Sequence, residues 1–155
     1  MVGPMRRSLQ SPESERSEAE YAMTLRTILV KDYMARYLVT VEPETEILRA
    51  VHTLVKNDVA GVPVVDSDGR LIGLLTEKDC MRVVLNATYH SEYGGVVADY
   101  MSTDVEVMNP NDSIADAAKR FLEKRYHRYP VLENGKLVGQ ISRRDIMRAL
   151  GDAWQ

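Results

Sequence analysis

The chain repeats itself at a fixed interval, and this repetition constrains its fold more than any other feature. Residues 30–34 read VKDYM, and residues 97–101, sixty-seven positions later, read VADYM. The match continues, with the loss of one residue in a turn, as far as Arg82 and Arg148. A match that runs through the whole segment predicts two copies of one structural unit, each of about sixty residues.

Each copy begins with the same succession of hydrophobic patterns. A short extended stretch comes before a proline, and an amphipathic helix follows the proline. The extended stretches are residues 38–41 and 105–108, and the apolar helix positions are Ile47, Ala50, Val51, Leu54 and Val55, repeated as Ile114, Ala117, Ala118, Phe121 and Leu122. Thr45 and Asp112 stand at equivalent positions, where their side chains are suited to capping the two helices.

A β-hairpin and a closing helix complete each copy. The pairs Asp68-Gly69 and Asn134-Gly135 are typical of hairpin turns. The sequence predicts strands at residues 61–65 and 71–75 in the first copy and at 129–132 and 137–141 in the second, with closing helices that begin at Thr76 and Ser142.

The fold class predicted from this order is α+β, with helices and strands mixed. The order strand–helix–strand–strand–helix occurs twice. Because a unit of about sixty residues is near the lower limit for stability alone, the two motifs are expected to pack as a pseudo-twofold pair. We expect a flexible N-terminal tail at residues 1–24, a first motif at 25–90, a linker at 91–96 and a second motif at 97–152.

Composition narrows the functional classes. The formal net charge is −3, so the basic excess typical of nucleic-acid-binding proteins is missing and no nucleic-acid partner is expected. No apolar run approaches the ~20 residues of a membrane span, so none is predicted. Cys80 is the single cysteine, which fits a reducing compartment. With no apolar stretch typical of a secretory signal in the first twenty residues, the sequence predicts a cytoplasmic protein.

The hairpin and closing-helix segments resemble a known family. Residues 61–79, GVPVVDSDGRLIGLLTEKD, and residues 128–145, RYPVLENGKLVGQISRRD, are similar to the signature half of a CBS motif. The resemblance covers roughly residues 25–150, and two motifs in register identify the chain as a tandem CBS pair, or Bateman module. It implies a regulatory module that senses a ligand in clefts between the motifs, and not an enzyme. No effector domain is recognised, so the chain is similar to a stand-alone member.

A Ser/Thr-x-x-Asp pattern opens both closing helices. One interpretation is structural, because Thr76 with Asp79, and Ser142 with Asp145, have the spacing of a capping box. The functional interpretation is compatible with it, since a helix N-terminus favours phosphate and a carboxylate accepts hydrogen bonds. The resemblance implies that Asp79 and Asp145 bind ribose, with Lys78 beside the first site.

Basic residues gather around the second copy alone. His127 and Arg128 come directly before a predicted strand, at positions that resemble the phosphate-binding positions of the regulatory gamma subunit of AMP-activated kinase. Arg143 and Arg144 lie at a helix N-terminus, where cations are unfavourable to the helix dipole. The presence of two arginines at this helix start indicates an anionic ligand. The corresponding residues of the first copy, Ala60, Gly61, Glu77 and Lys78, carry far less positive charge, so we expect the second site to bind phosphate better.

The resemblance also implies an adenine slot in each motif. In the first it would be lined by Thr40 and Val62, and in the second by Val107 and Tyr129 with Pro130. Ordinary core packing is an equal explanation for each of these residues.

These observations predict a module that binds AMP, ADP or ATP, with or without Mg, and transmits occupancy to an unknown enzyme or transporter, as an energy sensor would. We expect a homodimer, no obligatory cofactor, no metal site and no catalytic residue. No nucleophile elbow and no phosphate-binding glycine loop is present. Two alternatives stay open, a ligand-free dimeric scaffold and an S-adenosylmethionine sensor.

Overall fold

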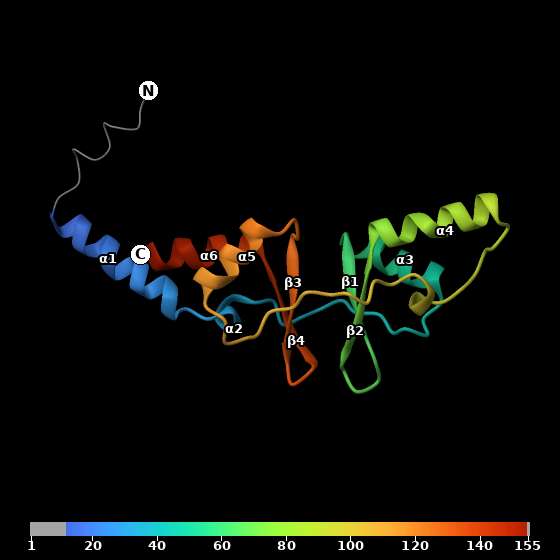
Figure 1. Ribbon diagram of the computed structural model, residues 1–155, viewed down its shortest axis with the longest axis horizontal. Coiled ribbons are helices and arrows are strands. Elements are labelled where there is room, and N and C mark those ends of the chain that lie inside the picture. Colours follow the sequence, from blue (N-terminus) through green and yellow to red (C-terminus); the bar gives the residue numbers. More distant parts are fainter. Residues whose placement is uncertain (1–11, 155) are drawn as a thin grey trace, which may run out of the picture. The chain divides into compact units, whose positions relative to one another are not determined.

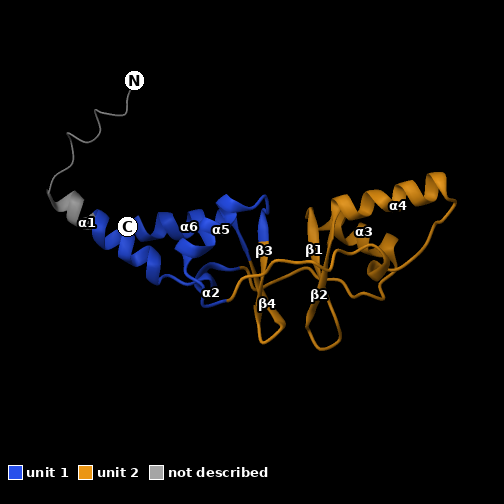
Figure 2. Cartoon of the chain, in the orientation of Figure 1, with its two compact units in different colours: residues 1–34, 110–128, 141–155 blue, residues 35–109, 129–140 orange. Residues whose placement is uncertain are grey.

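A computed structural model of the protein describes residues 12–154 and divides the chain into two compact units (Figures 1 and 2). The first unit combines the chain up to Met34 with Pro110–Arg128 and the segment from Ile141 onward. The second unit combines Ala35–Asn109 with Tyr129–Gln140. Each unit therefore takes segments from both repeats, and each is described by itself.

The second unit holds the helices and hairpin of the first repeat. Besides most of the second hairpin, its elements are α3 (Ile47–Lys56), β1 (Gly61–Val65), β2 (Leu71–Thr76), α4 (Glu77–Tyr89) and the short 3-10 helix η2 (Val97–Asp99). The strands β1 and β2 pair antiparallel, with Gly61 opposite Thr76. At the turn, Oδ1 of Asp66 accepts hydrogen bonds from two backbone N–H groups, and Gly69 adopts a φ of 81° that favours glycine.

The core of this unit forms where the apolar stripe of α3 meets the hairpin. Ile47, Ala50 and Leu54 are buried, as their spacing of three and four residues predicts. Val64 and Leu75, one from each strand, are fully buried in the same cluster. Burial of such side chains is worth about 1.5–3 kcal/mol each.

The hairpin of the second repeat consists of β3 (Arg128–Glu133) and β4 (Lys136–Ser142), which form a separate two-stranded sheet. The extended stretches predicted before each helix make single parallel bridges rather than strands. Val41 is bridged to Val64, and Met108 to Val131. The mixed α+β class with two repeated motifs is confirmed.

The first unit holds α1 (Pro12–Thr27), α2 (Val30–Tyr33), α5 (Ile114–Glu123) and α6 (Arg143–Trp154). Helix α1 packs on α5 and α6. The Tyr21 hydroxyl donates to the carbonyl of Leu150, and its ring meets Trp154 edge-on at 5.1 Å. Residues 1–11 of the predicted flexible tail lie outside the described residues. The rest of the predicted tail belongs to α1 and is helical, because these contacts give the helix a surface on which to pack.

The leading turn of each motif packs against the helix of the other. The Val30 N–H donates to the Asp112 carbonyl, just before α5, at 2.8 Å. The equivalent Val97 N–H donates to the Thr45 carbonyl, just before α3, at 2.9 Å. Both valines are fully buried. The repeats therefore exchange their leading turns, which explains why each compact unit draws on both halves of the sequence.

The predicted caps of α3 and α5 are wrong by one residue. The N-cap of α3 is Glu46, with no side-chain cap, while the Thr45 hydroxyl instead accepts from the Glu42 N–H. The N-cap of α5 is Ser113 rather than Asp112, and its hydroxyl accepts from the Asp116 N–H. The physical reason is that Thr45 closes the preceding turn, which moves the helix start by one position.

Candidate functional site

The N-terminus of α6 carries the carboxylate to which ribose binding was assigned. Oδ2 of Asp145 accepts hydrogen bonds from the Ser142 N–H at 2.9 Å and the Ser142 hydroxyl at 3.0 Å. The Ser142 hydroxyl in turn accepts from the Asp145 N–H at 3.2 Å. Oδ1 of Asp145 accepts from Nη1 of Arg148 at 2.8 Å. The predicted capping box is present and fixes one carboxylate oxygen, while among the described residues the other oxygen accepts from Arg148 alone.

The N-terminus of α4 carries the equivalent carboxylate in a more enclosed setting. Oδ2 of Asp79 accepts from the N–H and the hydroxyl of Thr76, both at 2.9 Å. Oδ1 accepts from the Ser102 hydroxyl at 3.2 Å and from Nη2 of Arg82 at 3.5 Å. Asp79 is the one charged side chain that is buried among residues 18–154. Oδ1 of Asp79 therefore has two protein donors, an arginine and the Ser102 hydroxyl, whereas Oδ1 of Asp145 accepts from an arginine.

The structure brings His127 and Arg143 together. Nη2 of Arg143 lies at hydrogen-bonding distance from Nδ1 of His127, and both side chains are exposed. Because a guanidinium can only donate, Nδ1 of His127 is the unprotonated ring nitrogen in this contact. The pair places the guanidinium of the first residue of α6 beside the residue that leads into β3.

The remaining basic residues of the prediction are solvent-exposed. Arg128 begins β3, Arg144 is the second residue of α6, and Lys78 is the second residue of α4. Within residues 18–154, the first turn of α6 thus presents two arginines, whereas the first turn of α4 presents Glu77 and Lys78. The difference in charge between the two motifs that the sequence predicted is a property of these helix starts.

The residues assigned to adenine slots differ in exposure. Val62, Tyr129 and Pro130 are buried, whereas Thr40 is exposed and Val107 is half-buried. The segments that carry the last two lie along the strands. For the second motif, the Met108 N–H donates to the Pro130 carbonyl at 2.9 Å. An adenine-binding role for these residues stays a prediction, and the buried ones also contribute to the core.

Sequence reasoning missed the arginine and tyrosine that accompany each carboxylate. The guanidinium carbon of Arg82 lies 5.9 Å from the centroid of the Tyr100 ring, and that of Arg148 lies 5.5 Å from the Tyr33 ring. Both distances fit a cation–π contact. The signal was present, because each arginine and each tyrosine recurs at the repeat interval. Ser102 was missed for the opposite reason, since its counterpart is Ala35.

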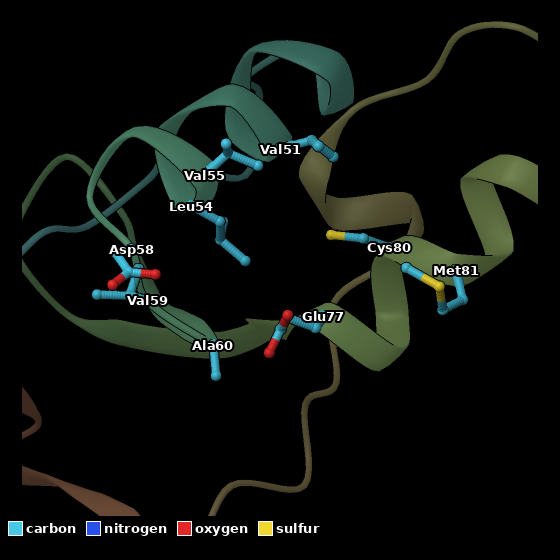
Figure 3. Close-up of a pocket in the computed structure, with 9 residues that line it drawn as sticks. All are labelled: Val51, Leu54, Val55, Asp58, Val59, Ala60, Glu77, Cys80 and Met81. Carbon is cyan, nitrogen blue, oxygen red and sulfur yellow. The ribbon is translucent and has the colours of Figure 1, made fainter.

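An apolar cavity of about 420 Å³ opens between α3 and α4 (Figure 3). Its lining residues are Val51, Leu54, Val55, Asp58, Val59, Ala60, Glu77, Cys80 and Met81. Burial, with the nearby charges of Asp79 and Glu77, raises the pKa of the Cys80 thiol. Most of the side chains that line the cavity are aliphatic, and its two charged residues, Asp58 and Glu77, are carboxylates that would repel a nucleotide phosphate.

The described residues contain neither a metal-binding cluster nor a helix suited to cross a membrane. Among residues 12–154, no group of three or more His, Cys, Asp or Glu side chains is placed to hold a metal ion. In the same part of the chain, no helix combines the length and the apolar character that a membrane crossing requires.

The repeats match a family profile in the same register. The profile described as CBS domain matches residues 30–86 and again residues 97–152. The chain belongs to the CBS domain family. Both capping-box carboxylates, and the leading turns that the two motifs exchange, lie inside the matched CBS segments.

Similar CBS proteins come from several organisms. An uncharacterized protein of Methanocaldococcus jannaschii, MJ1225, is 32% identical over 125 residues, which are 81% of this chain and 44% of that protein. The chain therefore spans less than half of this relative. The CBS domain-containing protein YhcV of Bacillus subtilis is 32% identical over 118 residues, which are 76% of this chain and 81% of YhcV.

A solved CBS-pair structure shares the fold. The crystal structure of CBSX2 in complex with AMP has a TM-score of 0.72 and 29% identity, and the match covers 83% of this chain and 99% of that one. CBSX2 of Arabidopsis thaliana is described as chloroplastic.

Proposed function

We propose that this CBS pair is a regulatory module that senses an adenine nucleotide, with the N-terminus of α6 as the principal binding site. The observation that carries the proposal is the arrangement of Asp145, Arg143 and His127 at that helix start. It combines an acceptor for ribose hydroxyls with donors for phosphate.

The phosphate would bind to the exposed cationic groups. The first-turn N–H groups of α6 and the guanidinium groups of Arg143 and Arg144 all favour an anion. Two arginines at the positive end of a helix dipole are locally unfavourable without such a ligand. Arg128, directly after His127, supplies a third exposed guanidinium in the same stretch of sequence. The similarity to CBSX2, whose structure contains AMP, supports this ligand class.

Ligand occupancy would act on α6 through Arg148. This side chain contacts the Asp145 carboxylate at 2.8 Å and lies over the Tyr33 ring. A ribose that takes the Asp145 oxygen would free Arg148 from that contact. We propose that the resulting change in α6 and α2 is what a regulated enzyme or transporter detects. By linkage, if nucleotide binding changes the affinity for that partner by some factor, partner binding changes the nucleotide affinity by the same factor.

Calorimetric titration tests the proposal. AMP, ADP and ATP, the last two with and without Mg, are titrated into the whole chain, with S-adenosylmethionine as a competing class. We expect Asp145→Ala and Arg143→Ala each to weaken AMP binding by about tenfold or more, because each removes a hydrogen bond to a charged group.

The matched control is Arg125→Ala. It removes the same charge from an exposed arginine that lies outside α6, so AMP binding should change little. If none of the three nucleotides binds, the proposal is overturned. Binding of S-adenosylmethionine alone would replace the ligand, and equal losses in all three variants would reduce the site to a general charge effect.

A homodimer is a separate part of the proposal, and the apolar surface of α3 and α4 supports it. The exposed large apolar side chains on these helices are Leu48, Val55, Met81, Val84, Leu85 and Tyr89. A patch of this kind is typical of a protein interface. Light scattering of Val84→Glu should show a loss of mass relative to the unmodified dimer. If the unmodified chain is a monomer, or if the variant is still a dimer, this surface is not the interface.

We propose a regulatory rather than a catalytic role. The Thr76 and Ser142 hydroxyls each donate to a carboxylate and accept a backbone N–H, so they serve as helix caps. A reducing compartment such as the cytoplasm fits the single buried Cys80.

A further inference from the structure

We propose that Ser102 determines which motif binds the nucleoside, because it occupies the ribose-binding carboxylate of the first motif. The proposal rests on the function above. It assigns to Ser102 a role in specificity, so that nucleoside binding is restricted to the carboxylate of Asp145.

The four acceptor positions of the Asp79 carboxylate are all in use. Oδ2 accepts the N–H and the hydroxyl of Thr76, and Oδ1 accepts Ser102 and Arg82. An ionised carboxylate offers about four lone-pair sites. A ribose with two adjacent hydroxyls would therefore have to displace protein donors from Asp79. Displacement is costly, since Nη2 of Arg82 is also held by the Tyr100 carbonyl.

The backbone holds Ser102 in place beside Asp79. The Ser102 N–H donates to the Leu74 carbonyl and the Leu74 N–H to the Ser102 carbonyl, both at 2.9 Å. The close approach needs a glycine on β2, because a Cβ on Gly73 would lie 2.9 Å from the Ser102 carbonyl oxygen. The hydroxyl is thus directed at the carboxylate by paired backbone, not by a freely moving loop.

The second motif has the same backbone pairing without the hydroxyl. The residue that corresponds to Ser102 is Ala35, and its N–H donates to the Gln140 carbonyl at 2.8 Å while the Gln140 N–H donates back at 3.0 Å. Asp145 keeps the two Ser142 donors on Oδ2, but its Oδ1 meets only Arg148. Asp145 therefore has an acceptor position for a ribose hydroxyl, and a second becomes available if Arg148 moves.

Removal of the Ser102 hydroxyl tests the proposal. Adenosine is the probe, since it lacks phosphate and its binding does not depend on the unequal basic residues. Calorimetry of the full chain should show one adenosine site in the unmodified protein. Ser102→Ala should add a second site, with first-motif affinity raised about tenfold or more.

Two further variants assign the sites. Asp145→Asn should abolish binding to the unmodified chain, and Asp79→Asn should abolish only the site gained in Ser102→Ala. Ser102→Thr keeps the hydroxyl and should behave as the unmodified protein, which separates a loss of the hydrogen bond from a disturbed fold. Thermal melts compare the stability of all variants.

The outcomes distinguish this inference from the proposed function. If adenosine binds at Asp145 but Ser102→Ala gains no site, Ser102 has no role in specificity while the nucleotide site stands. If adenosine binds both motifs of the unmodified chain, the inference is likewise wrong. If neither adenosine nor AMP binds the unmodified chain or Ser102→Ala, both proposals fail together.

Discussion

The hydroxyl of Tyr33 donates a 2.8 Å hydrogen bond to Oδ2 of Asp152. The corresponding residues of the other repeat are Tyr100 and Asn86, where the amide Nδ2 donates to the phenol oxygen at 3.1 Å. The direction of the hydrogen bond is therefore reversed between the repeats, because a carboxylate can only accept whereas an amide nitrogen only donates. The Tyr33 phenol therefore faces a charged carboxylate, whereas the Tyr100 phenol faces a neutral amide.

This contact predicts a titration at alkaline pH. The hydrogen bond to Asp152, followed by burial, raises the pKa of the Tyr33 phenol above its usual value near 10. The folded state favours the protonated phenol, so the stabilisation is complete below pH about 10 and is lost as pH rises through the raised pKa. In Asp152→Asn, phenolate absorbance should show a lower pKa for this residue. Tyr37→Phe removes a fully exposed tyrosine and shows how an ordinary phenol contributes to the absorbance. An unchanged titration in Asp152→Asn would contradict the effect of Asp152 on the Tyr33 pKa.

The capping boxes predict a loss of stability. Thr76→Ala and Ser142→Ala should each cost about 1 kcal/mol of unfolding free energy. The two losses should be similar, because the side chains of Asp79 and Asp145 are 12% and 14% exposed and water replaces the missing donor about equally well. Urea unfolding measures both. Thr45→Ala, which removes no helix cap, should change stability by less than about 0.5 kcal/mol, and a larger loss there would restore Thr45 as a cap.

A side chain at position 73 is predicted to clash with its neighbours and to destabilise the fold. A Cβ at this position would lie 2.7 Å from the sulfur of Met101 and 2.9 Å from the carbonyl oxygen of Ser102. The thioether can move but the backbone cannot, so Gly73→Ala should destabilise the fold by about 1–3 kcal/mol. Gly151→Ala is the control, since nothing lies within 4 Å of its Cβ and alanine favours a helix. Thermal unfolding that ranks the two variants equally would show that β2 has room at Gly73.

The Cys80 thiol is predicted to react slowly. Burial, helped by the charges of Asp79 and Glu77, raises its pKa, so less thiolate is present at neutral pH than in the unfolded chain. A disulfide reagent such as DTNB should react much faster after unfolding, and the native rate should rise toward alkaline pH. Glu77→Gln should increase the native rate modestly. Equal rates in native and unfolded protein would show that the thiol is accessible and unperturbed.

The secondary structure and the repeat register could be read from the sequence because they depend on local spacing. The stripe on α3 and the turn at Gly69 are set by residues a few positions apart. The start of α3 was misplaced by one residue because Thr45 has two possible partners, a helix N–H and the Glu42 N–H of the preceding turn, and sequence does not show which one it meets. Helix α1 was expected as a tail, since its docking depends on Tyr21 and Trp154, which are far apart in the chain.

The candidate site was only partly predictable for the same reason. Asp79 and Asp145 occupy identical positions in the repeat and have identical capping boxes. Their difference comes from Ser102, which follows Asp79 by 23 residues and reaches the start of α4 only through the fold, whereas the corresponding Ala35 carries no hydroxyl. Neither residue 35 nor residue 102 belongs to the local capping-box pattern, so that pattern does not predict the difference.

The exchange of leading turns has a consequence for how the halves of the chain can exist. Val30 completes the helical layer of the second repeat, and Val97 completes that of the first. A fragment that ends before residue 97 would expose the apolar seat of Val97 beside α3, and its own Val30 would have nowhere to be buried. Two such fragments could satisfy each other by trading these turns. Within one chain, the two motifs exchange these turns as the subunits of a domain-swapped dimer would, so each motif depends on the other for the burial of its leading valine.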